Sequence, residues 1–291
     1  PVARASTILF DTMQEMYKHE AKIKQHKNVT HYTYGRYGST TTIELENILK
    51  ELEKAYHVFL TGTGFGGIAL ALMSLCRPGD EIIVSDNVYG PTKEISEKLL
   101  KEFNINAKFY DPNSFDDLKN KVTKKTKMIL VENPGSNTFE FQDLSKIVSL
   151  AKRKKILTLL DNTWGTPLYL KPLEIGFDMS FSSATKYFSG HSDAMGGSLA
   201  VNKKVFKKIM FFYKLSGYRM SSDEAYLIIR GLRTLDTRLK QHYQNTKTVV
   251  NFLKKQKKII EILYPHKSGS KNYKLWKKYY TGATGLLSIV I

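Results

Sequence analysis

Short apolar runs and longer amphipathic segments alternate along most of this chain. Apolar residues recur at helical spacing from Ile43 to Leu52, and again after residue 67 up to Leu75. Between these two segments lie an apolar run at 56–60 and a glycine-rich turn at 61–67. Further apolar runs of strand length occur at 81–84, 108–110, 128–131 and 156–160, and helical patterns at 92–103, 115–122, 143–154, 222–231 and 235–255. Short apolar runs are typical of buried strands, and apolar residues three or four positions apart are typical of helices.

This alternation predicts an α/β fold with a mostly parallel sheet covered by helices on both faces. Ligands of such sheets bind beyond the carboxyl ends of the strands. Polar residues follow three of the predicted strands, as Glu132-Asn133, Asp161-Asn162 and the segment from Ser183 to Lys186. We therefore expect these side chains to meet at one edge of the sheet.

The composition narrows the class of protein. The chain has 291 residues, of which 42% are hydrophobic, enough for one large domain and part of a second. It lacks an uncharged apolar run of about 18 residues, which predicts no membrane association, and its N-terminal residues lack a signal-peptide pattern. The single cysteine, Cys76, cannot form an intrachain disulfide. We expect a cytoplasmic protein.

The net charge of +18 raises nucleic-acid binding as an alternative function. The basic residues cluster at 152–155, 254–258 and 277–278. Two of these clusters close predicted helices, where cations complement the negative end of the helix dipole. No zinc-finger spacing, basic-leucine heptad or RNA-recognition motif accompanies them, so we predict neither a nucleic-acid partner nor a metal site.

Lys186 stands in the segment Ser182-Ser183-Ala184-Thr185-Lys186-Tyr187, and Asp161 ends the preceding apolar run. An amine flanked by small hydroxyl residues, with an acid at a strand end, is the layout that a pyridoxal 5'-phosphate (PLP) enzyme needs. The lysine would form a Schiff base with the cofactor, the hydroxyls would hold its phosphate, and the acid would pair with the pyridine nitrogen.

The glycine-rich turn Gly62-Thr63-Gly64-Phe65-Gly66-Gly67 satisfies G-x-G-x-x-G between a predicted strand and a predicted helix. This pattern leaves a nicotinamide-dependent dehydrogenase as an alternative function. Asp80, Glu81 or Asp86 would then stand near the position of the acid that binds the ribose. Backbone N–H groups at a helix start bind any phosphate, so the glycines alone do not choose between cofactors. The dehydrogenase gives no role to Lys186.

Several longer motifs resemble the fold type I PLP enzymes of Cys/Met metabolism. They are Tyr34-Gly35-Arg36, Ser85-Asp86-Asn87-Val88-Tyr89-Gly90-Pro91-Thr92, Glu132-Asn133-Pro134-Gly135-Ser136, Asp161-Asn162-Thr163-Trp164, the segment 184–193 and the segment 225–234. The resemblance runs from Ala5 to the end of the chain, and Gly35, Trp164 and the segment 223–226 are most similar to the β-lyase branch. It implies the PLP-transferase fold, with a mostly parallel seven-stranded sheet.

The resemblance also implies the residues around the cofactor ring. Lys186 would form the Schiff base, and Asp161 would keep the pyridine nitrogen protonated so that the ring accepts electrons. Tyr89 would stack on the ring, and Asn133 would lie near it. His191, in Gly-His-Ser-Asp, is expected to organise the loop through hydrogen bonds rather than act as a base.

Four residues would bind the cofactor's phosphate group by the same resemblance. Gly64 and Phe65 would present backbone amides, and Ser183 and Thr185 would add hydroxyl donors. In this family, Tyr34 and Arg36 reach into the neighbouring subunit's site, where the arginine binds the phosphate. This implies a homo-oligomer, which we expect to be a tetramer built from dimers that share active sites.

The implied reaction is α,β-elimination of cystathionine to homocysteine, pyruvate and ammonia in methionine metabolism (transsulfuration). Lys186 would take the Cα proton, and Lys186 or Tyr34 would protonate the leaving thiol. Alternatives within the family are γ-elimination, γ-synthesis and cleavage of other cysteine conjugates. Two small departures from the family pattern are Thr166 in place of alanine and Ser39-Thr40-Thr41 after the arginine.

We expect three parts in the chain: an extended N-terminal arm over 1–36, a PLP-binding α/β domain over 37–232, and an incomplete α+β C-terminal domain over 233–291. The chain stops inside an apolar run at 286–291 that predicts a strand. In the family, the arginine that binds the substrate carboxylate follows this region. None of Arg219, Arg230, Arg233 or Arg238 matches its motif, so we expect weak substrate binding if the chain ends there.

Overall fold

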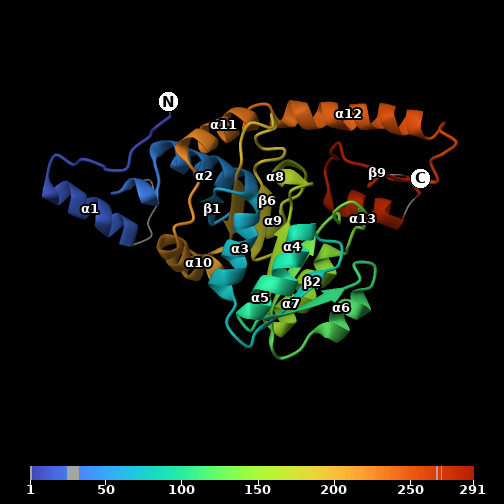
Figure 1. The fold of residues 1–291 in the computed structure, drawn as a ribbon, viewed down its shortest axis with the longest axis horizontal. Helices are drawn as coiled ribbons and strands as arrows, with labels where there is room; N and C mark the ends of the chain where they lie inside the picture. Colours follow the sequence, from blue (N-terminus) through green and yellow to red (C-terminus); the bar gives the residue numbers. More distant parts are fainter. Residues whose placement is uncertain (1, 25–32, 267, 270) are drawn as a thin grey trace.

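The computed structural model describes residues 2–24, 33–266, 268–269 and 271–291 (Figure 1). A seven-stranded sheet forms its centre, in the order β1-β7-β6-β5-β4-β2-β3. The strands are β1 (His57–Thr61), β2 (Glu81–Ser85), β3 (Asn106–Tyr110), β4 (Thr126–Glu132), β5 (Leu157–Asp161), β6 (Met179–Ser183) and β7 (Gly197–Val201). The apolar runs predicted as strands at 56–60, 81–84, 108–110, 128–131 and 156–160 overlap strands of this sheet, whereas the run at 286–291 contains the strand Ser288–Val290 of a separate two-stranded sheet.

The sheet is mostly parallel, as predicted. β3, β2, β4, β5 and β6 pair with one another in parallel, and β7 runs antiparallel between β6 and β1. Burial on both faces explains the apolar runs of the central strands β2, β4 and β5. The carboxyl ends of the parallel strands therefore share one edge, where the polar residues of the predicted site follow.

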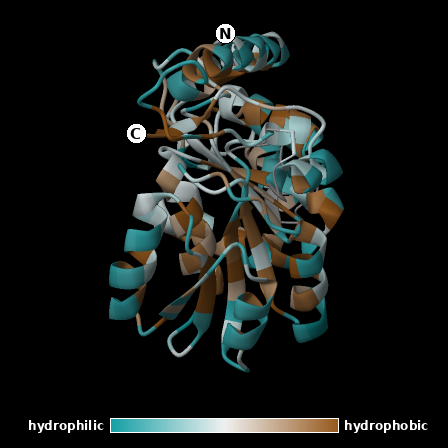
Figure 2. Cartoon of the chain, turned by 90° about the vertical axis from the view of Figure 1, so that its right-hand side faces the viewer, coloured by the Kyte–Doolittle hydropathy of each residue, from teal (hydrophilic) through white to brown (hydrophobic). Residues whose placement is uncertain are grey.

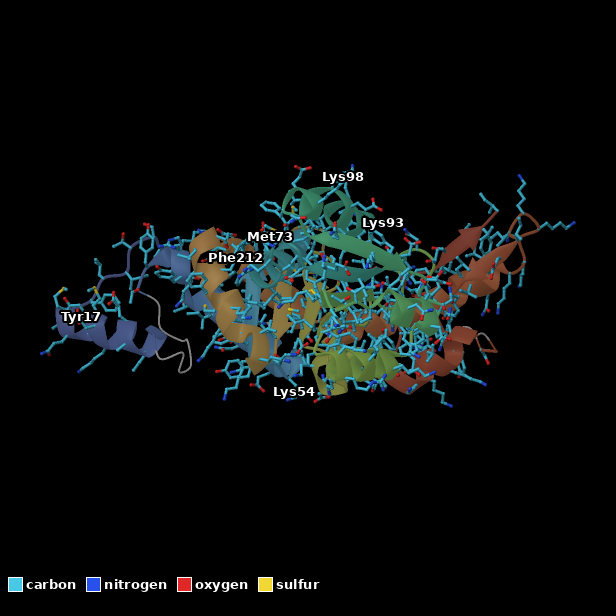
Figure 3. The ribbon with its side chains drawn as sticks, turned by 90° about the horizontal axis from the view of Figure 1, so that it is seen from below. Tyr17, Lys54, Met73, Lys93, Lys98 and Phe212 are labelled. Atoms are coloured by element: carbon cyan, nitrogen blue, oxygen red, sulfur yellow. The ribbon has the colours of Figure 1, made fainter. Side chains whose placement is uncertain are left out.

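Helices cover both faces of the sheet. On one face α3 (Gly64–Leu75) packs beside α10 (Lys203–Ser216), and α4 (Gly90–Glu94), the π-helical turn η2 (Ile95–Leu99) and α5 (Leu100–Glu102) lie further along. Met73 and Phe212, labelled in Figure 3, lie on α3 and α10 at the margin of this core. Figure 2 shows hydrophobic strands at the centre and hydrophilic outer helix surfaces.

The opposite face carries two groups of helices. α2 (Thr40–Glu53) and α11 (Ser222–Leu232) pack together near β1, and α6 (Phe115–Lys121) and α7 (Leu144–Lys154) cover the other half. The short helices α8 (Thr166–Tyr169) and α9 (Pro172–Ile175) connect β5 to β6. The structure thus has the three layers expected of an α/β fold.

The apolar spacing predicts a single helix at 92–103, but the structure has three consecutive helical elements there. α4 and α5 are joined by η2, whose wider turn shifts the apolar face by one position. Ile95 and Leu100 are buried, whereas Leu99 is 45% exposed. Lys93 and Lys98 lie on the outer side of this segment (Figure 3).

The N-terminal arm is partly helical, which corrects the expectation of an extended arm over 1–36. Met13–Lys24 forms α1, because helix-favouring Met, Gln, Glu, Lys and Ala residues dominate this segment. α1 projects from the body of the molecule, with Tyr17 on its surface (Figures 1 and 3). The chain before α1 is tied to the body by the ion pair between Arg4 and Asp223 on α11. Residues 25–32 of the arm lie outside the described part.

The C-terminal residues combine helices and strands. The long helix α12 (Leu235–Leu253) leads to a two-stranded antiparallel sheet of β8 (Glu261–Leu263) and β9 (Ser288–Val290), and α13 (Lys271–Tyr279) lies between these strands in sequence. Buried Tyr280 and Ala283 join the core around α7. Within the described residues, every helix is too short or too polar to cross a bilayer.

Candidate active site

The sheet brings the predicted site residues to its edge from four strands. Thr61 at the end of β1 pairs with Gly197 of β7, which also pairs with Ser183 at the end of β6. Asp161 ends β5 and is in register with Glu132 at the end of β4. Residues of neighbouring strands that are in register point to the same face. The hydroxyls and carboxyls thus lie along one edge.

Gly64 begins α3 directly beside Ser183. A Cβ on Gly64 would lie 2.5 Å from Ser183 Oγ, so only glycine fits this approach. Thr63 caps the helix, and its Oγ1 accepts the Gly66 N–H at 3.1 Å. The first N–H groups of a helix, here those of Gly64 and Phe65, have no acceptor within the helix and attract anions. With the Ser183 hydroxyl they form a cradle for a phosphate group.

Asp161 is the buried acid of the site, with 8% of its surface exposed. Its Oδ1 accepts the Thr163 N–H at 2.9 Å. Burial raises the pKa of Asp161 to about 6, against the hydrogen bonds from Thr163, which lower it. At neutral pH the group is therefore mostly an anion that a cationic ring nitrogen can neutralise.

Lys186 lies in the tight turn that follows β6. Lys186 N donates to Ser183 O at 3.1 Å, and Gly190 N donates to Lys186 O at 2.9 Å. His191 Nδ1 lies 2.7 Å from Ser189 O, so this histidine helps to hold the turn, as expected. The Lys186 side chain is exposed and has no hydrogen bond or ion pair with the other described residues. Its amine is available for covalent chemistry.

Tyr89 stands between β2 and α4, with 52% of its surface exposed at the same edge of the sheet. An exposed aromatic ring at a strand end is suited to stack on a planar ligand. Thr185 is more enclosed, because its hydroxyl exchanges hydrogen bonds with the backbone of Gly196 at 3.0 and 3.3 Å.

Asn133 is buried and satisfied by protein groups. Its Nδ2 donates to Tyr280 Oη at 2.9 Å, and its Oδ1 accepts the Gln142 N–H at 2.7 Å. Tyr280 also packs edge to face against Trp164. Motif analysis identified Asn133 but not Tyr280, which comes from the distant C-terminal segment and lies in no motif.

Within one chain, Tyr34 and Arg36 contact the N-terminal segment and α10. Arg36 donates to Lys214 O at the end of α10 at 3.0 Å, and its guanidinium lies 4.6 Å from the centre of the Tyr37 ring. Tyr34 is 45% exposed and pairs with Thr7 through an isolated bridge. Both side chains are therefore on the surface near α10.

The fold and this site define a class of protein, and comparison with known proteins agrees with it. The whole chain, residues 1–291, matches the family described as Cys/Met metabolism PLP-dependent enzymes, and the chain belongs to that family. It is a PLP-dependent enzyme of a lyase family. The glycine-rich turn is therefore not the dinucleotide-binding loop of a dehydrogenase.

Individual relatives carry different activities in their names. The chain is 35% identical to an L-alanine/L-glutamate racemase of Wolbachia pipientis and 31% identical to a cystathionine beta-lyase of Escherichia coli, in both cases over 100% of this chain and 73% of the relative. The crystal structure of cystathionine gamma-lyase from Lactobacillus plantarum matches with a TM-score of 0.90 and 27% identity, over 100% of this chain and 73% of that one. The predicted fold type I architecture is thereby confirmed.

The residues present fit PLP. At the Gly64 cradle there is no room for a Cβ, and the first N–H groups of α3 have no acceptor within the helix. Asp161 supplies a buried carboxyl, and Lys186 supplies an amine that other described residues do not engage.

Proposed function

We propose that this enzyme cleaves cystathionine by α,β-elimination, giving homocysteine, pyruvate and ammonia. One observation carries the proposal: the Lys186 side chain is exposed and no other described residue engages its amine. Lys186 follows β6, which contributes Ser183 to the Gly64 cradle and pairs with β5, the strand that ends at Asp161. The identity with the cystathionine beta-lyase of Escherichia coli over the full chain favours β-elimination within the family. The absence of an apolar membrane-spanning helix among the described residues and the single cysteine support action in the cytoplasm.

Each residue of the site has a task in this reaction. The amides of Gly64 and Phe65 and the Ser183 hydroxyl would hold the phosphate of PLP, and the Thr185 hydroxyl would join them by exchanging its bond to the Gly196 carbonyl. Bound PLP supplies an electron-withdrawing ring that accepts the electron pair left when the Cα proton departs. Asp161 keeps a proton on the ring nitrogen, and Tyr89 covers one face of the ring. Asn133, which follows β4 and is bonded to Tyr280 and Gln142, would border the ring.

Lys186 moves the protons. Its Nζ would hold PLP covalently in the resting enzyme and, as the free amine, would take the Cα proton of the bound substrate. The Cβ–S bond breaks with its electron pair on sulfur, and the thiolate takes a proton from Lys186 or from Tyr34. Water then hydrolyses the released aminoacrylate to pyruvate and ammonia.

The surface position of Tyr34 and Arg36 supports shared sites between subunits. Within one chain Tyr34 and Arg36 are exposed, with Arg36 bonded to Lys214 O of α10 and Tyr34 paired with Thr7. In a homotetramer built from dimers, they would enter the partner's site, where the Arg36 guanidinium binds the phosphate in a bidentate manner.

Replacing Lys186 tests the assignment. We expect Lys186→Ala to lose the visible absorbance of the bound cofactor and to reduce pyruvate formation from cystathionine by at least about 1,000-fold, because the amine is both attachment point and base. Lys207→Ala, which removes an exposed lysine of α10, serves as the matched control and should retain both properties. A Lys186→Ala enzyme that keeps full lyase activity would refute the proposal.

A second candidate is racemisation of small amino acids, favoured by the 35% identity with the Wolbachia pipientis racemase. Both reactions begin with removal of the Cα proton, but a racemase returns a proton to the opposite face. Incubation with L-alanine, followed by chiral chromatography, tests this activity. With cystathionine, pyruvate indicates β-elimination and 2-oxobutyrate indicates γ-elimination.

A further inference from the structure

The backbone of Tyr89 is held by a carboxyl group that belongs to another strand. Tyr89 N donates to Glu132 Oε2 at 2.6 Å. Glu132 N donates to Ser85 Oγ at 3.2 Å, so the end of β4 is also tied to the end of β2. Tyr89 directly precedes α4 and provides no side-chain cap for it, and Glu132 provides a fixed acceptor at this turn.

Glu132 also lies beside the acid of the site. It is in register with Asp161 on the adjacent parallel strand, so the two side chains point to the same face of the sheet. Burial and the neighbouring Asp161 carboxyl raise the pKa of Glu132 well above its ordinary range, whereas the pKa of Asp161 is raised only to about 6. Two like charges this close are unfavourable, so Asp161 ionises first and Glu132 keeps its proton at neutral pH.

We propose that Glu132 is a positioning residue for the cofactor: its uncharged carboxyl group fixes the turn that carries Tyr89 and leaves the single negative charge of the pair on Asp161. One acid would then balance one cationic ring nitrogen, and the Tyr89 ring would be held where it can stack on the cofactor. The inference rests on the proposed roles of Tyr89 and Asp161 but not on the choice of amino-acid substrate.

The hydrogen bond and the charge can be separated by two variants. Gln in place of Glu132 keeps a carbonyl oxygen that can accept the Tyr89 N–H and is neutral at every pH, like the protonated acid. Ala removes the acceptor. We expect Glu132→Ala to weaken binding of PLP to the PLP-free enzyme by about tenfold at neutral pH, the scale of one hydrogen bond to a charged or polar group, and Glu132→Gln to stay within about twofold of the wild type.

Glu140 offers a matched control in the same loop. Its Oε2 accepts from Asn87 Nδ2 at 3.1 Å and from Thr138 Oγ1 at 2.6 Å, but it does not bond to the Tyr89 amide. Glu140→Gln makes the same chemical change as Glu132→Gln, and we expect it to leave the PLP dissociation constant unchanged. Circular dichroism of each variant establishes that it is folded before binding is compared.

Hydrogen exchange of the PLP-free enzyme provides a readout that needs no bound cofactor. The peptide covering 85–92 should exchange faster in Glu132→Ala than in the wild type, and Glu132→Gln should restore slow exchange. Wild-type PLP affinity in Glu132→Ala, or equal weakening in Ala and Gln, overturns the proposal. Failure of the enzyme to cleave cystathionine would overturn the proposed function and leave this binding series intact.

Discussion

The burial of Asp161 determines over which pH range the site carries the charge that the cofactor needs. The ordinary pKa of an aspartate lies near 4, and burial raises that of Asp161 to about 6. The group is thus mostly ionised above pH 6 and mostly protonated below it. A protonated Asp161 is neutral and no longer stabilises a cation on the ring nitrogen.

We expect PLP to bind the PLP-free enzyme more weakly as the pH falls through about 6. With a pKa near 6, the ionised fraction of Asp161 falls from about nine-tenths near pH 7 to about one-tenth near pH 5, so affinity should fall by up to about tenfold. Asp161→Asn should bind weakly at both pH values and show a smaller change between them. Equilibrium dialysis of PLP measures this difference.

An exposed acid provides the control for that titration, because other groups on PLP and the protein also change charge in this range. Asp116 on α6 is exposed, and Asp116→Asn should keep the wild-type pH dependence. An Asp161→Asn enzyme with the full wild-type slope would show that another group is responsible.

At the scale of elements, the contact between α3 and β6 shapes the phosphate cradle. Gly64 lies against Ser183, and a Cβ on Gly67 would lie 2.8 Å from the Phe181 ring. The first turn of α3 can approach the sheet this closely only because Gly64 and Gly67 have no side chain. The glycines in this turn thus serve the packing of helix on strand as well as the binding of an anion.

We expect Gly64→Ala to lower the free energy of unfolding by about 1–3 kcal/mol and to weaken PLP binding, because the added methyl group must displace Ser183. Gly90→Ala is the matched control. Gly90 also begins a helix, and no neighbouring atom lies within 4 Å of the position of its Cβ. Denaturant unfolding should show Gly90→Ala to be neutral or slightly stabilised; equal losses in both variants would mean that contact with Ser183 is not the cause.

Elements with local signals could be predicted from the sequence, and those formed by distant contacts could not. α7 was expected at 143–154 and spans Leu144–Lys154, because its apolar face repeats clearly. β7 was not assigned, since Gly197-Ser198-Leu199-Ala200-Val201 is a short run of mostly small residues. It becomes a strand only because β1 and β6 bind it on either side.

At the scale of the whole molecule, the C-terminal segment is anchored to the ends of β4 and β5. Tyr280 is 5% exposed, packs against Phe141 and Trp164, and hydrogen-bonds to both the side chain and the carbonyl of Asn133. Burial raises the pKa of Tyr280, so its hydroxyl stays protonated and can donate. The segment after α13 thus supports the residue that follows Glu132.

We expect Tyr280→Phe to lower the free energy of unfolding by about 1–3 kcal/mol, because Asn133 is left with buried unpaired groups while the aromatic packing remains. Tyr226→Phe, at a position that is 43% exposed on α11, should change stability little. Thermal unfolding of both variants checks this. Equal stability of Tyr280→Phe and the wild type would mean that water replaces the lost hydroxyl.

Some residues of the candidate site could be identified from local sequence motifs, whereas the roles of others depend on contacts between distant parts of the chain. Lys186 and Asp161 could be identified because each stands in a motif that follows an apolar run. Glu132 was recognised as a polar strand end but not given a task, because its bond to the Tyr89 amide depends on the order of strands in the sheet. Tyr280 could not be linked to Asn133 by any pattern, since their contact is made by tertiary packing alone.

The position of β1 at the edge of the sheet has a consequence for synthesis on the ribosome. Among the described strands β1 pairs with β7 alone, through His57 with Val201 at one end and Thr61 with Gly197 at the other. The loop that would hold the phosphate leaves the ribosome early, but its strand has no partner until residue 201 has emerged. Pairing of such distant segments is slow, so the cofactor site should be completed late and PLP captured only near the end of folding.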